Sequence, residues 1–432
     1  MSLATKLREW LETDFPSHDQ MENLRYYKYA AVDKSYLTKY VLRHYWNWAI
    51  TLFPMWIAPN LITLIGLFFM IFNVLLVALY VPEFGTDAPG WIYLSFAIGL
   101  WLYSTFDNVD GKQARRTGSS SPLGELFDHG CDALNTTYLV VLQLAALGLG
   151  QTPSLMVVFA VTTMAGFYMS TAEEYYTGVL YLGVVNGPTE GIVITCLGFL
   201  WSWLYGAASW HVPLDTVSSV SWLATFLPNG TTAAQLLVWS TFGLFIFMHC
   251  PAVAMSVYEA CMKKRLAPGE VAMTSFLPMA IFALAQYYWA MSPDSIVMVD
   301  HHFFLFVLAN GTLFGFMVSS IIFAHLTKSP FPNITALATP VVVMAVLVNA
   351  PSIIGIRLLP PSLELVILWL EWIVCTVVYG VWAVLVIDGF CDYLGIRCLV
   401  IPAHKPIDDA LVAAEQGDAS PSSNESQYRT FT

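Results

Sequence analysis

The sequence predicts an all-α, polytopic membrane protein, and three observations support this prediction. Hydrophobic residues make up 57% of the 432 residues and charged residues only 11%, less than half of the share that soluble domains carry. Apolar runs long enough to cross a bilayer recur along most of the chain. The 15 Trp and 21 Tyr residues suit aromatic belts at the two membrane surfaces.

We expect about ten transmembrane helices, because a span needs roughly 20 mostly apolar residues. Their predicted ranges are 61–80, 91–111, 128–148, 154–176, 188–206, 233–258, 270–291, 302–325, 333–350 and 363–388. Ahead of them, residues 34–57 mix basic, aromatic and apolar positions. That mixture is typical of an amphipathic helix lying in the membrane interface.

The placement of basic residues supports this topology. If the N-terminus is cytosolic and all ten segments cross, 17 of the 18 Lys and Arg residues face the cytosol, and only Arg357 does not. Cytosolic segments of membrane proteins carry such an excess of positive charge. We therefore expect both termini in the cytosol. The seven cysteines form no C-x-x-C pair, which predicts neither disulfides nor a structural zinc site.

Four aspartates stand out near the junction of the second and third spans. Asp107 and Asp110 are three residues apart, so they share one face of a helix. Asp128 and Asp132 are four residues apart and share a face in the same way. The turn-rich stretch 116–122 can reverse the chain between them. The two pairs then face each other at the cytosolic membrane boundary.

Four converging carboxylates repel one another unless cations lie between them. Oxygen ligands without His or Cys favour Mg²⁺ or Mn²⁺ over zinc. Two such ions can clamp a pyrophosphate and neutralise the charge of a phosphoryl-type displacement. The sequence therefore predicts a two-ion site that acts on a phosphate ester.

The neighbouring residues suit a bound nucleotide. Gly111, Ala114 and Gly124 have little or no side chain, so a ligand can approach the helix backbone closely. Arg115 offers a planar fork of donors for phosphate oxygens. His129 lies within reach of the same place and is a candidate general base.

The string D-x-x-D-G-x-x-A-R-x(8)-G-x-x-x-D-x-x-x-D resembles the signature of CDP-alcohol phosphotransferases. Its fixed positions are Asp107, Asp110, Gly111, Ala114, Arg115, Gly124, Asp128 and Asp132. Four further stretches resemble the eukaryotic choline/ethanolamine phosphotransferase branch of that family. They are residues 56–63, 127–132, 173–178 and 186–191.

The residue patterns and this resemblance together predict a division of the chain. We expect a cytosolic N-terminal segment with the interfacial helix at 1–60, a catalytic six-helix core at 61–262, four further transmembrane helices at 263–400 and a disordered tail at 401–432. The resemblance also implies a homodimer in the endoplasmic reticulum or Golgi membrane. The expected partners are CDP-choline or CDP-ethanolamine, diacylglycerol and membrane lipids, with no nucleic acid.

In such an enzyme the four aspartates hold two divalent ions. A diacylglycerol hydroxyl attacks the β-phosphate of the CDP-alcohol and releases CMP. Asp132 is the base often proposed for the family, and His129 is the alternative in this branch. We favour His129, because a metal-bound carboxylate is a weak base and an imidazole is poised near neutral pH.

The head group is the least determined part of the prediction. Choline is bound by aromatic faces and carboxylates, whereas the ammonium of ethanolamine needs hydrogen-bond acceptors. The candidate contacts are Glu173, Glu174, Tyr175, Tyr176, Asn186 and Glu190. We favour choline with some use of ethanolamine. The alternatives are an ethanolamine-specific enzyme and, from another class, an ion-coupled membrane transporter, although no internal repeat points to a transporter.

Overall fold

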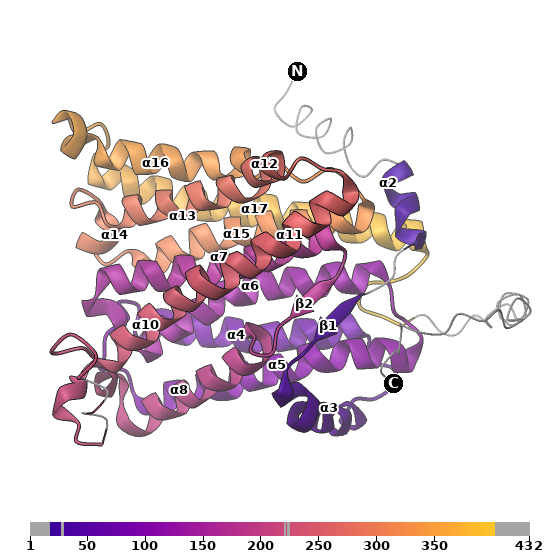
Figure 1. Cartoon of the computed structure of the whole chain (residues 1–432), viewed down its shortest axis with the longest axis horizontal. Coiled ribbons are helices and arrows are strands. Elements are labelled where there is room, and N and C mark those ends of the chain that lie inside the picture. The colour runs from indigo at the N-terminus through magenta and orange to yellow at the C-terminus, as the bar shows by residue number, and fades with distance from the viewer. Residues whose placement is uncertain (1–17, 27–29, 220–221, 223–224, 402–432) are drawn as a thin grey trace, which may run out of the picture.

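The computed structural model describes residues 18–26, 30–219, 222 and 225–401. This part of the chain is built mainly of helices that run side by side along the long axis of the molecule (Figure 1). The tail expected at 401–432 lies outside the described residues from position 402 on, as does residue range 1–17 at the other terminus.

Long helices make up the body of the bundle. They are α4 (Pro59–Tyr80), α5 (Gly90–Thr117), α6 (Pro122–Ala146), α7 (Pro153–Thr177), α8 (Ile192–Tyr205), α10 (Ala233–Leu244), α11 (Cys250–Lys264), α13 (Leu277–Ala290), α15 (Phe303–Thr327), α16 (Ile334–Ile354) and α17 (Pro361–Leu394). The shorter α-helices are α2 (His18–Glu22), α3 (Arg43–Ala49), α12 (Pro268–Val271) and α14 (Ile296–Val299).

Short 3₁₀ or π-helical turns extend several of these helices. They cover Asn23–Tyr26, Thr38–Leu42, Ile50–Leu52, Leu149–Gln151, Gly187–Gly191, Ala207–His211, Leu214–Thr216, Phe245–His249 and Ala272–Phe276. Two strands, β1 (Ala31–Asp33) and β2 (Leu180–Leu182), pair in parallel and join the N-terminal segment to the chain that follows α7.

Within the described residues, seven helical segments are long and apolar enough to cross a membrane. They are Pro59–Tyr80, Pro153–Thr177, Ala233–Lys264, Pro268–Ala290, Phe303–Thr327, Ile334–Ile354 and Pro361–Leu394. The other three predicted spans are also helical, as α5, α6 and α8. Helices α5 and α6 carry the charged residues of the motif, and α8 has only 14 residues.

Several boundaries differ from the sequence prediction. Helices α5, α11 and α17 each end six residues later than predicted, at Thr117, Lys264 and Leu394. Helix α6 begins at Pro122 rather than at 128, because the Ser121 side chain caps it and Pro suits the first helical turn. The interfacial segment is helical over residues 38–52, which is shorter than the predicted 34–57. The seven cysteines are free, as the sequence predicts.

Helix α15 lies at the centre of the bundle. Of its most apolar stretch, 78% is buried, against 11% for α17 and 11% for the continuous α10–α11 segment. Helix α15 packs against α6, α7 and α17, so it joins the motif-bearing helices to the C-terminal ones. The first six predicted spans and the last four therefore share one interior.

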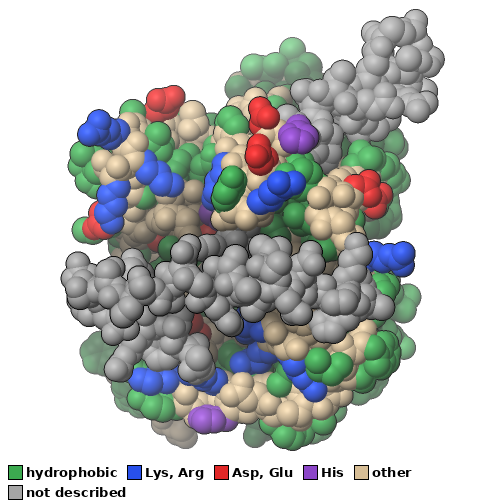
Figure 2. Space-filling view, turned by 90° about the vertical axis from the view of Figure 1, so that its right-hand side faces the viewer, with side chains coloured by type: hydrophobic (Ala, Val, Ile, Leu, Met, Phe, Trp, Pro, Cys, Tyr) green, Lys and Arg blue, Asp and Glu red, His purple; other side chains and the backbone are tan. Residues whose placement is uncertain are grey.

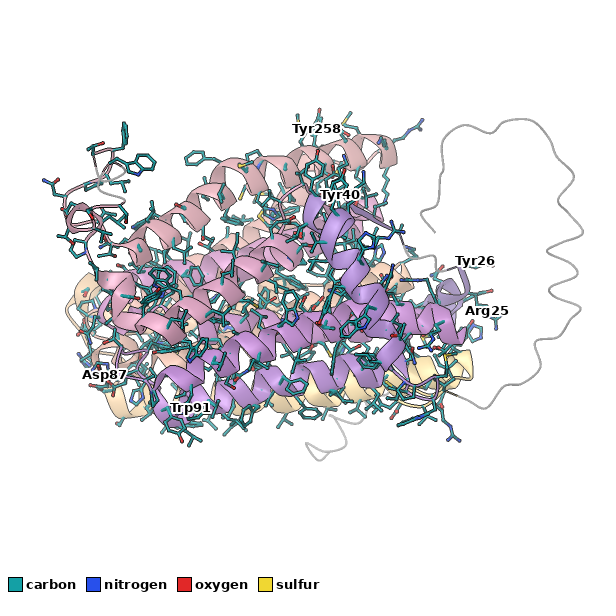
Figure 3. All side chains as sticks on the ribbon, turned by 90° about the horizontal axis from the view of Figure 1, so that it is seen from below. Arg25, Tyr26, Tyr40, Asp87, Trp91 and Tyr258 are labelled. Atoms are coloured by element: carbon teal, nitrogen blue, oxygen red, sulfur yellow. The ribbon has the colours of Figure 1, made fainter. Side chains whose placement is uncertain are left out.

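One end of the bundle carries charged side chains of both signs. Figure 2 shows one end face, across which Lys and Arg side chains are spread. Arg25 and Tyr26 lie near this end in Figure 3, and Asp87 and Trp91 lie at the other. Arg357, the one basic residue predicted to face away from the cytosol, follows α16 and precedes α17. The orientation predicted from the basic residues stays a prediction.

The N-terminal segment and the end of α17 meet at the same end of the molecule (Figure 1). Met21 and Leu24 pack there with Leu123 and Leu126 of α6 and with Phe390 of α17. We call this group the terminal cluster. It covers the start of α6, directly beside the aspartate motif.

Candidate active site

The turn between α5 and α6 brings the two halves of the motif together. Helix α5 ends at Gly118, whose φ of 65° is left-handed and therefore favours glycine. The Ser121 hydroxyl then accepts a hydrogen bond from the Gly124 amide and starts α6. The last turns of α5 and the first turns of α6 consequently run antiparallel, as the sequence predicts.

Three of the four aspartates converge. Asp107, Asp128 and Asp132 each offer a carboxylate oxygen, and these atoms all lie within 4.8 Å of one another. In the described part of the chain, Oδ1 of Asp107 and Oδ1 of Asp128 are buried and have no hydrogen-bond partner. Buried unpaired carboxylate oxygens are costly unless a cation balances them. This donor set therefore fits a divalent cation that prefers oxygen ligands.

The fourth aspartate is tied to another helix. Thr63 of α4 donates a hydrogen bond from its hydroxyl to Oδ2 of Asp110. Asp110 is buried, and it lies within electrostatic reach of Asp107 and Asp128. All four aspartates thus belong to one acidic site formed by α5 and α6 and supported by α4.

Tyr103 holds Asp132 from the other side. Its buried hydroxyl donates a hydrogen bond of 2.6 Å to Oδ1 of Asp132. Sequence reasoning missed both Tyr103 and Thr63. Tyr103 lies four residues before Asp107 on α5, so helical spacing alone places it on the same face. Thr63 ends the family-like stretch 56–63, which was the available signal for it.

His129 is oriented by two groups. Its Nδ1 lies 3.0 Å from the carbonyl oxygen of Glu125, and a carbonyl only accepts, so Nδ1 carries the hydrogen. Nε2 of the neutral ring is then the free base. Nε2 lies 3.8 Å from Oε2 of Glu174, a buried carboxylate of α7 that favours a positive charge on the ring.

The small residues of the motif leave space beside the helices. A Cβ placed on Gly111 would meet only Nη1 of Arg115, at 3.6 Å. A Cβ on Gly124 would lie 3.7 Å from Oδ1 of Asn60, an ordinary contact. Packing within the described chain therefore does not require glycine at either position. Of the other two motif residues, Ala114 is partly exposed and Arg115 is exposed.

The head-group candidates on α7 separate into two groups. Glu173 and Glu174 are both buried, and Glu174 is the one that faces His129. The Tyr175 hydroxyl donates to the carbonyl oxygen of Ser329 at 2.7 Å. The Tyr176 hydroxyl lies 2.6 Å from Oγ of Ser275 and its ring stacks on Phe331. Both tyrosines thus contact the C-terminal part of the chain, including the loop between α15 and α16.

The remaining two candidates organise the loop before α8. Asn186 caps the turn that starts at Gly187 by accepting a hydrogen bond from the Thr189 amide. Glu190 accepts hydrogen bonds from the Asn186 amide and from the Ser35 hydroxyl. These contacts join the loop to the N-terminal segment rather than to the aspartates.

The interfacial segment is anchored to the motif helix by side chains that sequence reasoning missed. Gln113 of α5 donates hydrogen bonds of 2.8 Å and 3.0 Å to the carbonyl oxygens of Pro54 and Ile57. Arg116 donates to the carbonyl oxygen of Phe53 at 2.9 Å. Gln113 and Arg116 therefore hold residues 53–57 against the end of α5.

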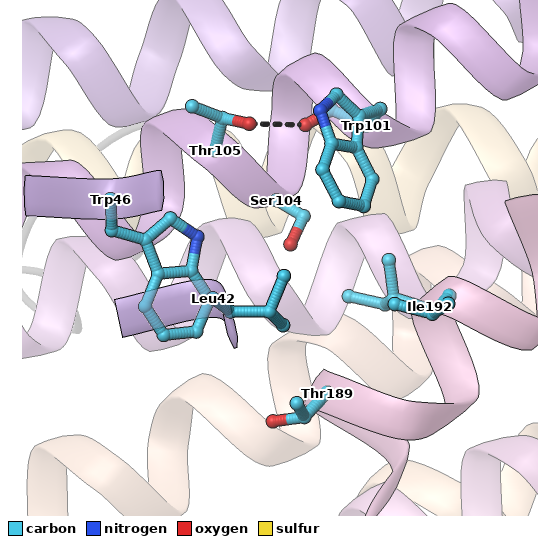
Figure 4. A pocket seen from close by; sticks show the side chains of 8 residues that line it. Leu42, Trp46, Trp101, Ser104, Thr105, Thr189 and Ile192 are labelled. Atoms are coloured by element: carbon cyan, nitrogen blue, oxygen red, sulfur yellow. Dashed lines mark hydrogen bonds between the residues drawn. The ribbon is translucent and has the colours of Figure 1, made fainter. Parts of the chain in front are cut away.

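A small cavity lies on another side of α5, between it, the interfacial segment and the start of α8 (Figure 4). It is lined by Leu42, Trp46, Trp101, Ser104, Thr105, Thr189, Ile192 and Val193. Its lining contains no predicted site residue, so among the described residues it lies apart from the acidic site.

Comparison with known proteins places this geometry in a family. Residues 56–247 match the model of the CDP-alcohol phosphatidyltransferase family. Cholinephosphotransferase 1 of Saccharomyces cerevisiae is 38% identical over 327 residues, which cover 74% of this chain and 81% of the relative. The chain belongs to the CDP-alcohol phosphatidyltransferase family.

Two further relatives of this family extend the comparison. Choline/ethanolaminephosphotransferase 1 of Arabidopsis thaliana is 37% identical over 314 residues, covering 71% of this chain and 77% of the relative. Ethanolaminephosphotransferase 1 of Homo sapiens is 30% identical over 380 residues, covering 85% of this chain and 90% of the relative. The family resemblance stated from the motif is confirmed, and enzymes of this family generally depend on divalent metal.

Proposed function

We propose that this chain transfers phosphocholine, and also phosphoethanolamine, from a CDP-alcohol to the hydroxyl of diacylglycerol. The observation that carries the proposal is the convergence of Asp107, Asp128 and Asp132 within 4.8 Å, inside the family-matched region. The relatives named cholinephosphotransferase and choline/ethanolaminephosphotransferase support this choice of substrates. The products are phosphatidylcholine or phosphatidylethanolamine and CMP.

In this proposal Asp107, Asp110, Asp128 and Asp132 hold two Mg²⁺ or Mn²⁺ ions. The unpaired buried oxygens of Asp107 and Asp128 support that assignment. The bound ions neutralise the negative charge of the pyrophosphate. The hydrogen bonds from Thr63 and Tyr103 restrict the carboxylates to orientations that suit ligation.

The chain's own base is His129. As the diacylglycerol oxygen forms its bond to the β-phosphorus, Nε2 of His129 takes the hydroxyl proton. The bond from that phosphorus to the oxygen bridging the two phosphates breaks, and CMP leaves with the electron pair. Glu174, 3.8 Å from Nε2, balances the charge of the protonated ring. Asp132 is the alternative base, although Tyr103 already occupies one of its oxygens.

The nucleotide packs against Gly111, Ala114 and Gly124, with Arg115 donating to phosphate oxygens. The space beside both glycines supports this placement, because within the described chain no neighbour accounts for the missing side chains. Of the six head-group candidates, Glu174 lies beside His129, with its Oε2 atom 3.8 Å from Nε2 of the ring. The other five stay predictions.

We also propose that the basic end of the bundle faces the cytosol, in the endoplasmic reticulum or Golgi membrane, with both termini on that side. The distribution of Lys and Arg along the sequence, together with the Lys and Arg side chains on that end face (Figure 2), supports the orientation. In this arrangement the soluble CDP-alcohol reaches the aspartates from the cytosol. Diacylglycerol reaches them from the membrane. We also propose that the protein is a homodimer, as the family resemblance implies.

One assay tests the function. The purified protein is supplied with diacylglycerol and with radiolabelled CDP-choline or CDP-ethanolamine, with and without Mg²⁺, and CMP and labelled lipid are measured. We expect CMP and labelled lipid in equal amounts, and only when Mg²⁺ is present. We expect more of both products from CDP-choline than from CDP-ethanolamine. Activity with CDP-ethanolamine alone would identify the ethanolamine-specific alternative. The absence of CMP release from both donors would overturn the proposal.

A further inference from the structure

A second group of metal-ligating side chains lies beside the acidic site. It consists of Glu125 on α6, Glu174 on α7 and His325 on α15, and we call it the Glu–Glu–His cluster. One ligand atom from each residue lies within 4.8 Å of the others. Both glutamates are buried and His325 is partly buried. The consecutive helices α6 and α7 and the distant α15 thus bring two carboxylates and an imidazole to one point.

Glu174 points to a missing cation in this cluster. Its side chain is 3% exposed, and Oε2 has no hydrogen-bond partner among the described residues. The Nε2 atom of His129, at 3.8 Å, is too distant for a hydrogen bond. Glu125 lies within electrostatic reach of Lys328 and favours the charged form of its ammonium. The unbalanced charge in the cluster therefore rests on Glu174.

The ligand set selects a different metal from the four aspartates. Mg²⁺ prefers oxygen ligands alone, whereas one imidazole with two carboxylates is a set that zinc accepts in four-coordinate sites. Three protein ligands leave the fourth position to water. The enzyme thus has an oxygen-only site and, next to it, a site of mixed oxygen and nitrogen ligands.

We propose that the Glu–Glu–His cluster binds Zn²⁺ and that bound zinc inhibits the enzyme. The inhibitory part rests on the proposed function, in which Glu174 balances the proton taken by His129. Zinc would engage Oε2 of Glu174 and place two positive charges beside the imidazole. The carboxylate that lies 3.8 Å from the imidazole would then be held by the metal, so zinc would lower the maximal rate and leave the aspartate site intact.

The first experiment measures zinc binding without activity. Full-length Asp107→Asn protein in saturating Mg²⁺ is titrated with Zn²⁺ by calorimetry, and bound metal is counted by elemental analysis. We expect one zinc per chain. His325→Gln should weaken its binding by roughly 10–100-fold or more, since even partners outside the ligand shell contribute that much. Equal zinc binding with and without His325 would overturn the site.

A matched control comes from another helical histidine. His249 lies on the α10–α11 segment, and its Nε2 contacts the Gly166 carbonyl oxygen at 3.1 Å, not a carboxylate. His249→Gln should therefore keep the zinc affinity of the parent protein. If it loses zinc as His325→Gln does, the binding is not that of the Glu–Glu–His cluster, and the proposal fails.

The second experiment measures inhibition. CMP release is followed at saturating Mg²⁺ while Zn²⁺ is raised. The parent enzyme should be inhibited, and His325→Gln should need at least about tenfold more zinc for the same inhibition. The rate of His325→Gln without zinc should stay within about twofold, because no step of the reaction is assigned to His325. Unchanged zinc sensitivity would overturn the inhibitory role.

Two further outcomes separate this inference from the proposed function. If zinc binds to the cluster but the parent protein releases no CMP, the site stands and the proposed function fails. If CDP-choline displaces zinc, and His325→Gln raises the KM for CDP-choline, the cluster binds the cationic head group instead of a metal. That result would overturn the zinc proposal and leave the phosphotransferase assignment in place.

Discussion

The carboxylate of Asp107 has two opposing effects on this protein. It lies within 4.8 Å of the oxygens of Asp128 and Asp132, and like charges this close repel. The same crowding creates affinity for a divalent ion. In the proposed two-ion site, Asp107 would therefore stabilise the metal-bound protein and destabilise the metal-free one.

Asp107→Asn tests both effects. We expect turnover to be lost, because a ligand is removed, and thermal stability without metal to be unchanged or higher, because repulsion is relieved. The Mg²⁺-induced rise in melting temperature should shrink. Activity assays and thermal unfolding with and without Mg²⁺ measure these effects. Near-normal activity at saturating Mg²⁺ would argue against the two-ion site.

Loss of the proposed base, His129, should produce a different kinetic defect from loss of a proposed metal ligand such as Asp132. His129→Ala should lower kcat by about 10²–10⁴-fold with little effect on the affinities for Mg²⁺ and CDP-choline. Its pH–rate profile should lose the limb that an imidazole produces near neutral pH. Asp132→Asn should instead weaken Mg²⁺ and nucleotide binding. An unchanged profile in His129→Ala would pass the base role to Asp132.

Tyr103 acts through Asp132. Tyr103→Phe removes the 2.6 Å hydrogen bond and keeps the ring, so Asp132 loses its orientation. We expect the half-saturating Mg²⁺ concentration to rise by roughly 10–100-fold, with recovery of rate at high Mg²⁺. Tyr93→Phe is the control, because the Tyr93 hydroxyl on the same helix has no hydrogen-bond partner among the described residues. If both variants raise the half-saturating Mg²⁺ concentration equally, Tyr103 does not orient Asp132 for metal binding.

At the scale of elements, the α5–turn–α6 hairpin was predictable and its surroundings were not. The spacing of the aspartates is local, so it fixes which face of each helix they share. Ser121 and Gly118 follow the known chemistry of helix ends. The contact of Thr63 with Asp110 depends on how α4 packs beside α5, and no pattern within either helix encodes that. The same holds for Glu174 and His129.

Replacing two different glycines of this bundle by alanine should have opposite effects on stability and on nucleotide binding. Gly311 of α15 packs so closely on Thr137 of α6 that an added Cβ would collide with its side chain. Gly311→Ala should therefore cost about 1–3 kcal/mol of stability. Gly111→Ala should leave stability nearly unchanged and weaken CDP-choline binding, because its space is open on the protein side. Thermal unfolding and nucleotide titration separate the two. Loss of stability in Gly111→Ala would contradict the nucleotide role.

At the scale of the whole molecule, hydropathy and charge placed the helices well. Each of the ten predicted spans coincides with a helical segment, because the bilayer sets a minimum length that a single sequence reveals. Their arrangement was not predictable: α15, from the C-terminal part, lies at the centre and contacts α6 and α7. Hydropathy indicates which segments enter the membrane, but it does not indicate which of these segments pack against one another.

An even number of crossings predicts both termini on one side. Epitope tags at the two ends and in the loop around Arg357 test this in sealed microsomes treated with protease. We expect both terminal tags to be digested and the Arg357 tag to be protected until detergent is added. A protected C-terminal tag would mean an odd number of crossings. The orientation rests on the basic residues at one end of the bundle.

The terminal cluster also sets an order of events during synthesis. Met21 and Leu24 leave the ribosome early, but Phe390, which packs with them over the start of α6, is made after every other long helix. Chains are completed from the N-terminus, so this contact closes last. A nascent chain halted before α17 carries all four aspartates and lacks the part of the cover over α6 that Val386 and Phe390 supply. The ribosome must therefore finish nearly the whole protein before its catalytic end is built.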